Sequence, residues 1–249
     1  MSTPESTRPA DPLPAPPASE DAERRAAGEQ LRAGLVVVLA IASGATDALG
    51  FLALGNAFTS VMTGNMVLFG VAAAHGDGSE MLLTAVAIGA FVAGAALGAR
   101  IAGTAAPGDP VWPRAVTVAL VVELVLFAGV SIAWWGFGAE PPRAAFLPML
   151  AAAAAALGLQ SSAIQRFGVS GLSTTYLTGT LTTVVIRLVS GHGVRAVRHS
   201  ALILLGLVVG AAAMAGLLAS VPMLAPVLLV GTVGSVLVVV LLRRALVHR

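Results

Sequence analysis

Six runs of apolar residues, each long enough to cross a bilayer, constrain this chain more than any other feature. A hydrocarbon core of about 30 Å needs about 20 residues of helix at a rise of roughly 1.5 Å per residue. The runs lie near 33–54, 81–103, 115–137, 145–165, 200–220 and 224–242. Only 10% of the residues are charged, whereas a soluble domain carries about a quarter. We therefore expect lipid, and not water, to cover most of the folded surface.

Two shorter and more polar runs lie between these spans, near 58–74 and 174–190. Each opens with a stretch rich in hydroxyl groups and glycine, TSVMTGN in the first and STTYLTGTLTT in the second. We interpret both as re-entrant half-helices. The predicted fold class is all-α: a polytopic membrane protein with six transmembrane helices plus two short re-entrant half-helices.

The two tails differ from the apolar middle of the chain. Residues 1–30 hold many Pro and acidic residues, without the apolar core of a signal peptide, and predict a disordered cytoplasmic tail. Residues 31–242 form a single transmembrane domain, and residues 243–249 form a basic cytoplasmic tail.

An internal repeat divides the transmembrane domain into halves at 33–137 and 145–242. GATDALGFLALGNAFTSVMTGNMV matches LGLQSSAIQRFGVSGLSTTYLTGTLT, which sets Asp47 opposite Gln160, and FVAGAALGA (91–99) matches LVVGAAAMA (207–215). Each half holds three spans, an odd number, so the halves are predicted to be inverted relative to each other, as in many transporters.

The arginine residues predict the orientation. With six spans, both termini share one side, and nearly all arginines near the span ends fall on it: Arg24, Arg25, Arg32, Arg100, Arg114, Arg166, Arg195, Arg198, Arg243 and Arg244. Arg143 falls on the other side, with Asp77 and Glu80. Cytoplasmic loops carry the excess of basic residues, so both termini are predicted to be cytoplasmic.

Two carboxyl groups lie inside predicted spans. An acid there costs about 2.5–3.5 kcal/mol on insertion scales, so it needs a partner or a water-filled cavity. Asp47 is either a cation- or proton-binding group beside a substrate cavity, or an acceptor that locks the re-entrant tip. Glu123 lies nearer the centre of its span, and is either a proton-coupling group or a neutral acid bonded to a neighbouring helix.

The two polar tips are the most specific motifs. The candidate substrate- or ion-binding residues there are Thr63, Gly64 and Asn65 in the first half, and Thr174, Thr175, Thr178, Gly179 and Thr180 in the second. Glycine permits close backbone approach, and the N-terminus of a half-helix attracts anionic or dipolar ligands. The tips either meet at the midplane around a site or simply cap the half-helices. Gln160 either mirrors Asp47 as a neutral group or makes an interhelical hydrogen bond.

Several classes of function are not supported. The chain has no Cys and 4 His without metal-ligand spacing, and no catalytic set occurs at membrane depth. We expect no enzyme activity, no cofactor and no metal. The arginines form no stripe with aromatics, which argues against nucleic acid as a partner. The expected partners are the lipid bilayer and an unidentified small molecule or ion, and the sequence leaves homo-oligomerisation open.

The segments GATDALGFLALG and FTSVMTGN, with TTYLTGTLT in the second half, resemble the signatures of the YoaK-like family of bacterial membrane proteins (domain of unknown function 1275). The resemblance covers roughly residues 33–242 and implies a six-span protein of the bacterial plasma (inner) membrane, without implying a substrate. The sequence favours a permease for a small solute, proton- or cation-coupled through Asp47 or Glu123. The alternatives are a channel-like pore and a non-transporting scaffold or accessory subunit.

Overall fold

The computed structural model describes residues 18–106, 108–168, 177–191 and 193–247, and every regular element in these ranges is helical. The elements are α1 (Ala18–Ala53), α2 (Met62–His75), α3 (Gly78–Ala102), α4 (Arg114–Gly136), α5 (Arg143–Gln165), α6 (Leu177–Val189), α7 (Gly193–Ser220), the 3₁₀ turn η1 (Pro222–Leu224) and α8 (Ala225–Val247). Six helices in this part of the chain are long and apolar enough to cross a membrane. They coincide with the six predicted spans, three of which run one residue past the end of the helix, and the prediction of six spans is confirmed.

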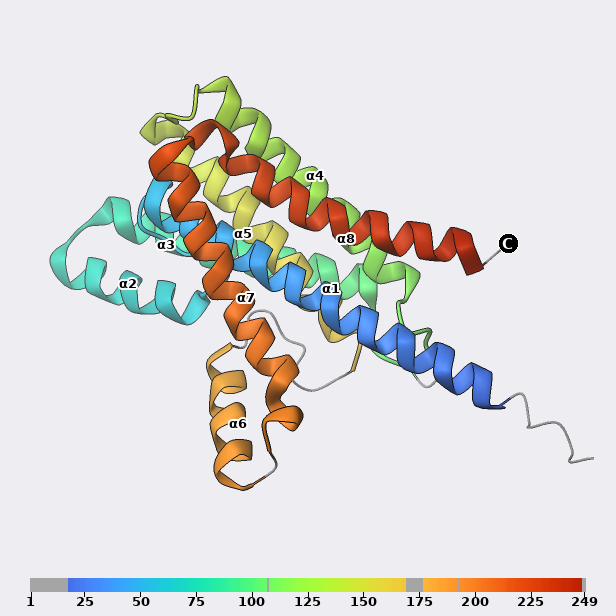
Figure 1. Ribbon diagram of the computed structural model, residues 1–249. Coiled ribbons are helices and arrows are strands. Elements are labelled where there is room, and N and C mark those ends of the chain that lie inside the picture. The colour runs from blue at the N-terminus through green and yellow to red at the C-terminus, as the bar shows by residue number, and fades with distance from the viewer. Residues whose placement is uncertain (1–17, 107, 169–176, 192, 248–249) are drawn as a thin grey trace, which may run out of the picture.

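The ends of the domain differ from the prediction. Residues 18–30, expected to be disordered, form the first turns of α1, and α8 continues through most of the predicted basic tail to Val247. Ala, Glu, Arg and Gln, all good helix formers, dominate the stretch after Pro17 and extend the hydrophobic helix into water. Both extensions lie at the end of the bundle where the chain begins and ends (Figure 1).

Helices of the two halves pack crosswise. In Figure 1, α7 of the second half crosses α1 of the first, and these two helices pack closely along their contact. Glycines make the crossing tight: a Cβ atom at Gly44 would lie 2.0 Å from the carbonyl oxygen of Leu207, and one at Gly210 would lie 2.0 Å from that of Ile41. Backbone therefore meets backbone, as small residues allow between membrane helices.

The same arrangement recurs between α3 and α5. A Cβ atom at Gly158 would lie 2.1 Å from the carbonyl oxygen of Phe91, and one at Gly94 would lie 2.0 Å from that of Ala155. Thus α1 crosses α7, and α5 crosses α3, each through a pair of glycine contacts.

These contacts also suggest a register between the two halves of the chain. The contacts pair Gly44 of α1 with Gly158 of α5 as equivalent positions. Counted from this pair, Asp47 falls opposite Ser161, one residue after the predicted Gln160. The sequence match between the two halves is too weak to set their register. The close backbone contacts at the glycines give a register.

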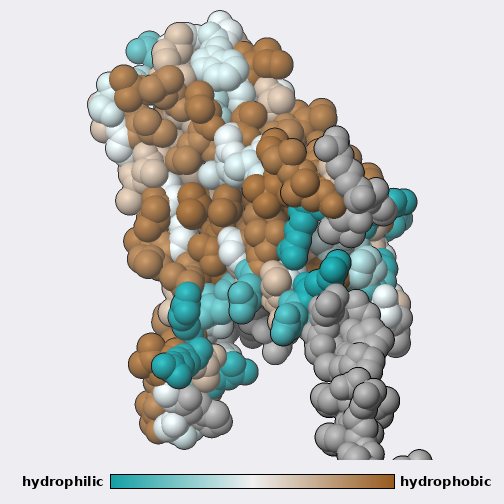
Figure 2. Space-filling model, turned by 45° about the vertical axis from the view of Figure 1, so that its right-hand side comes forward, coloured by the Kyte–Doolittle hydropathy of each residue, from teal (hydrophilic) through white to brown (hydrophobic). Residues whose placement is uncertain are grey.

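Helices α4 and α8 run antiparallel along one side of the bundle (Figure 1). At one end, the indole N–H groups of Trp134 and Trp135 donate to the carbonyl oxygens of Pro222 and Met223, at 3.0 and 2.8 Å. At the other end, Arg244 donates to the carbonyl oxygen of Trp112 at 3.3 Å. Figure 2 shows hydrophobic residues over most of the visible face and hydrophilic residues gathered along its lower edge, as expected of a surface covered by lipid.

The two short helices occupy the predicted positions in the sequence but differ in their packing. Helix α2 packs against α3, and α6 packs against α7, instead of against each other. Helix α6 projects at the lower end of the molecule (Figure 1), below the edge where hydrophilic residues gather in Figure 2. Its exposed apolar face includes Leu181, Ile186 and Val189.

Candidate functional site

The chain turns back into the bundle directly after α1. Gly55 and Asn56 take positive φ angles of 102° and 63°, which reverse the chain at the end of the helix. The following residues return along the last turns of α1, since a Cβ atom at Gly50 would lie 2.6 Å from the carbonyl oxygen of Ala57. Residues 57–61 therefore reach the level of Asp47 before α2 begins.

Asp47 holds this returning segment, which we call the first tip (residues 57–61). One carboxylate oxygen, Oδ1, accepts hydrogen bonds from the backbone N–H groups of Thr59 and Ser60, at 2.8 and 2.7 Å, and from the Thr59 hydroxyl at 3.0 Å. The other, Oδ2, accepts from the Ser60 hydroxyl at 2.6 Å. All three residues are buried. The carboxylate thus satisfies the free N–H groups of a non-helical segment, which the low-dielectric interior requires.

Asn65 fastens the other side of the first tip. Its side-chain oxygen accepts from the backbone N–H of Phe58 at 2.8 Å, and its amide donates to the carbonyl oxygen of Phe58 at 2.7 Å. Gly64 leaves room for the Phe58 ring, which would lie 3.2 Å from a Cβ atom there. Val61 is the N-cap of α2 and makes no side-chain capping bond. Asn65 and Gly64 therefore shape the tip, and the exposed Thr63 does not cap the helix.

Asp47 lines none of the four best-formed pockets in the described part of the chain. Four hydrogen bonds use about the full acceptor capacity of a carboxylate. Each of the four pockets found in the described part of the chain is lined by residues nearer the two ends of the bundle or the α4–α5 contact, and none includes Asp47. In this conformation Asp47 acts as the lock for the first tip, one of the two roles that its position allows.

Glu123 has a different environment. Its side chain has no exposed surface, and neither carboxyl oxygen has a hydrogen-bond partner among the described atoms. The interhelical hydrogen bond considered from the sequence is not formed here. An unpartnered acid in an apolar core is far less costly as the neutral form than as the anion.

Gln160 joins α5 to α1. Its amide donates to the hydroxyl of Ser43 at 2.9 Å and, more weakly, to the carbonyl oxygen of Leu39 at 3.4 Å. All three residues are buried. The interhelical hydrogen bond predicted as one alternative for Gln160 is confirmed.

The second tip is described only in part. Thr174 and Thr175 lie outside the described residues. Thr178 and Gly179 lie in the first turn of α6, where their carbonyl oxygens accept from Thr182 and Thr183 at 3.0 and 2.9 Å. Thr180 is buried, whereas Thr178 is exposed. The described residues of α6 pack against α7 and do not pack closely against α2, which holds Thr63, Gly64 and Asn65.

Sequence reasoning missed the partners of the polar groups. Thr59 and Ser60, which bind Asp47, lie 12 and 13 residues after it, and Ser43 binds Gln160 across 117 residues. The available signal was a pair of adjacent hydroxyl residues following the glycine-asparagine turn at Gly55 and Asn56, in a segment otherwise apolar.

A charged pair closes the end of the bundle that carries both termini. Arg166, just after α5, donates to both carboxylate oxygens of Asp109, at 2.9 Å each, and also to the carbonyl oxygen of Ala102. The Arg166 hydrogen bond and the backbone N–H of Ala106 hold the pKa of Asp109 below its ordinary value. The loop between α3 and α4 is thereby tied to the end of α5.

The fold and these buried polar contacts define a polytopic α-helical membrane protein with one segment turned back into the bundle. The chain belongs to the family described as protein of unknown function (DUF1275), whose model matches residues 35–241. It is similar to the transmembrane protein YoaK of Bacillus subtilis, with 32% identity over 151 residues, or 59% of this chain. The match spans 63% of the length of that relative. No solved structure matches this chain.

Proposed function

We propose that this protein is a secondary permease for a small solute, built as an inverted repeat of three plus three spans in the bacterial plasma membrane. The observation that carries the proposal is the crosswise packing of α1 on α7 and of α3 on α5 through equivalent glycines. Transporters with inverted repeats work by rocking one group of helices against the other around a central site. Backbone contact across small side chains suits such motion, because few long side chains interlock at the crossing.

The orientation in the proposal has both termini in the cytoplasm. It is supported by the charges at the two ends of the bundle. Arg24, Arg32 and Arg244 line a pocket at the end that carries the termini. Asp77 and Glu80 line a pocket at the opposite end, together with a single arginine. This asymmetry follows the excess of basic residues in cytoplasmic loops. In this orientation the first tip enters the bundle from the outside of the cell. Because the second half of the repeat is inverted, α6 lies on the cytoplasmic side.

Glu123 is assigned the coupling role in this proposal. It is a buried acid in the centre of α4 without a hydrogen-bond partner among the described atoms. A rearrangement of the helices that lets water reach Glu123 can therefore be coupled to its protonation and deprotonation. Asp47 is assigned a structural role, because its four hydrogen bonds leave its oxygens engaged. The mechanism has three stages: protonation of Glu123 from one side, rocking of the α1–α7 and α3–α5 pairs, and release of the proton with the solute to the other side.

A flux assay with matched carboxyl variants tests this function. The protein is reconstituted in vesicles that contain a pH-sensitive dye, and a broad panel of solutes is added outside. We expect at least one solute to drive proton movement in the wild-type protein. Glu123→Gln is expected to abolish that movement, whereas Glu140→Gln, the same change at an exposed loop residue, preserves it. Equal proton movement in Glu123→Gln and wild type would remove the coupling role, and no response to any solute would argue against a permease.

One observation favours a second candidate, a non-transporting scaffold or accessory subunit. Asp47 accepts four hydrogen bonds, and it lines none of the four best-formed pockets among the described residues. A sealed bundle is what a scaffold requires. The accessibility of single cysteines discriminates the two functions, since the native chain has no Cys to remove. A permease exposes positions near Glu123, such as Leu120 and Phe127 about one turn away on α4, to a water-soluble thiol reagent during its cycle, and a scaffold does not.

A further inference from the structure

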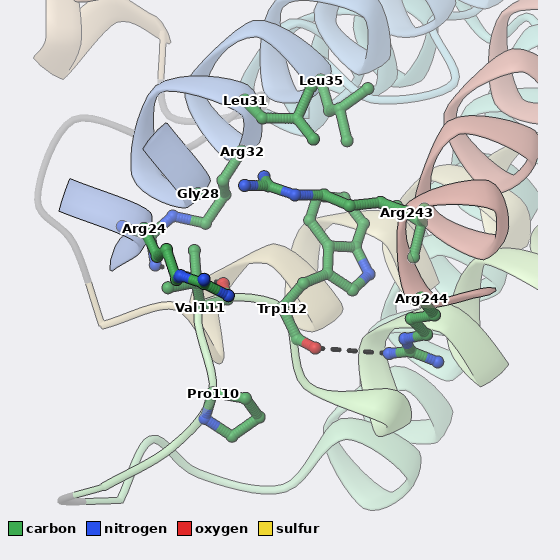
Figure 3. Close-up of a pocket in the computed structure, with 11 residues that line it drawn as sticks. Arg24, Gly28, Leu31, Arg32, Leu35, Pro110, Val111, Trp112, Arg243 and Arg244 are labelled. Carbon is green, nitrogen blue, oxygen red and sulfur yellow. Dashed lines mark hydrogen bonds between the residues drawn. The ribbon is translucent and has the colours of Figure 1, made fainter. Parts of the chain in front are cut away.

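A pocket lined by arginine lies at the end of the bundle that carries both termini. Three separate segments form it: the first turns of α1, the residues just before α4 and the last turns of α8. Figure 3 shows arginines of α1 and of α8 on either side of the indole of Trp112. The cavity measures about 370 Å³. A cavity of this size suits a small group, such as the headgroup of a lipid, better than a large solute.

The lining of this pocket is strongly basic. Four arginines and no acidic residue line it: Arg24, Arg32, Arg243 and Arg244. Within the described residues, Arg32 donates to the carbonyl oxygen of Val111 at 3.4 Å and Arg244 to that of Trp112 at 3.3 Å. Both bonds are long and use one of five N–H groups of each guanidinium. Asp109 of the neighbouring pocket is engaged by Arg166.

The positive-inside rule alone would account for arginines at this end of the bundle, but not for their convergence. Arg24 and Arg244 are brought into one cavity by helices from opposite ends of the chain. The guanidinium of Arg32 is also held over the ring of Phe167, 5.2 Å from its centroid, which positions it without neutralising it. A planar guanidinium group can donate two N–H groups to two oxygens of the same phosphate, so convergent arginines suit a phosphate ligand.

Apolar side chains complete the pocket on the side of the bilayer. Leu31 and Leu35 of α1 and Val240 of α8 line it next to the arginines. Leu35 and Val240 belong to the buried core, at the level where the long hydrophobic spans begin and end. A ligand that fills this pocket therefore meets cations at one end and hydrocarbon at the other.

We propose that this pocket binds an anionic phospholipid, with the phosphate held by the arginines and the acyl chains lying along α1 and α8. Basic pockets between helices on the cytoplasmic side are suited to anionic headgroups. The bound lipid joins the two ends of the chain, since α1 and α8 supply all four arginines. This site is separate from Glu123 and does not depend on the permease function.

Lipid binding to the full-length protein in zwitterionic detergent tests the proposal. Phosphatidylglycerol, phosphatidylcholine and inorganic phosphate are titrated separately, and bound lipid is counted by native mass spectrometry alongside the shift in melting temperature. We expect phosphatidylglycerol to bind and stabilise the protein. The Arg243→Gln/Arg244→Gln variant removes two charge-assisted contacts and is expected to bind about tenfold more weakly or worse.

The matched control is Arg100→Gln/Arg114→Gln, which removes two exposed arginines at the same end but outside the pocket. It is expected to bind as the wild type does. Equal loss in the two double variants would assign the effect to overall charge and overturn the proposal. Equal binding of phosphatidylcholine, or equal stabilisation by inorganic phosphate, would overturn the anionic lipid as the ligand. If the double variant does not fold, Arg243→Gln alone, which leaves the bond from Arg244 to Trp112, gives the same comparison.

Discussion

Replacing Asp47 with alanine tests how the first tip is held. The change leaves the backbone N–H groups of Thr59 and Ser60 without their acceptor in a buried site. An unsatisfied buried donor costs about 1–3 kcal/mol. The two N–H groups together therefore predict a loss of about 2–6 kcal/mol in the free energy of unfolding.

Asp47→Asn separates the hydrogen bonds from the charge. The amide oxygen can still accept from both N–H groups, and the Ser60 hydroxyl can turn to accept from the new amide. What is lost is the extra strength of bonds to a charged acceptor, so the expected cost is smaller, about 1–2 kcal/mol. Proton movement in the flux assay is expected to persist in this variant, because Asp47 has a structural role in the proposal.

Reversible unfolding in mixed detergent measures both variants, and hydrogen exchange over residues 57–61 locates the effect. Asp77→Ala is the matched control. Asp77 also accepts two backbone N–H bonds, from Ser79 and Glu80, but at an exposed site where water replaces the carboxylate. If Asp47→Ala were no more destabilising than Asp77→Ala, or if exchange at the first tip were unchanged, the role of Asp47 as a lock would be wrong.

Three further predictions concern the packing, a surface ion pair and the orientation. Gly210→Ala inserts a methyl group 2.0 Å from a carbonyl oxygen of α1, and this overpacking is expected to lower the free energy of unfolding by about 1–3 kcal/mol. In the same unfolding assay, Gly216→Ala is the control and should not be destabilising, because nothing lies within 4 Å of the new methyl group. Because Arg166 lowers the pKa of Asp109, their interaction stabilises the fold at neutral pH, and this stability is lost as the pH falls through the lowered pKa. Asp109→Asn should remove this pH-dependent loss of stability from unfolding curves measured in acid. A single cysteine at Ser79 should react with an impermeant reagent added outside intact cells, and reaction from the cytoplasm alone would reverse the proposed orientation.

The spans were predictable because the hydrocarbon thickness translates directly into a length of apolar sequence. The start of α1 was not, since a search for apolar runs ignores the helix propensity of the Ala-, Glu- and Arg-rich residues that precede Leu35. The packing of α6 also lies beyond sequence reasoning. Its apolar face predicts only that it needs a covering surface, and lipid, α7 or a deeper position in the bundle would each supply one.

The one-residue ambiguity in the internal alignment has a simple cause. Along an α-helix, a shift of one residue turns a side chain by about 100° but leaves an apolar stretch equally apolar. The similarity between the halves could therefore not distinguish Gln160 from Ser161 as the counterpart of Asp47. The close contacts at Gly44 and Gly158 do distinguish them, because only a residue without a Cβ atom fits each crossing.

The two buried acids looked alike in the sequence, and the fold separates them. Asp47 lies near a helix end, so a returning segment can place four donors on it. Glu123 lies in mid-helix, and no donor among the described atoms reaches its carboxyl oxygens. A folded chain gains nothing in stability from such an acid, since an apolar side chain of similar volume avoids the cost of burying a polar group. Groups that break the local rules of folding without compensation concentrate at functional sites, and this is the physical reason for placing the proposed coupling step at Glu123 instead of at Asp47.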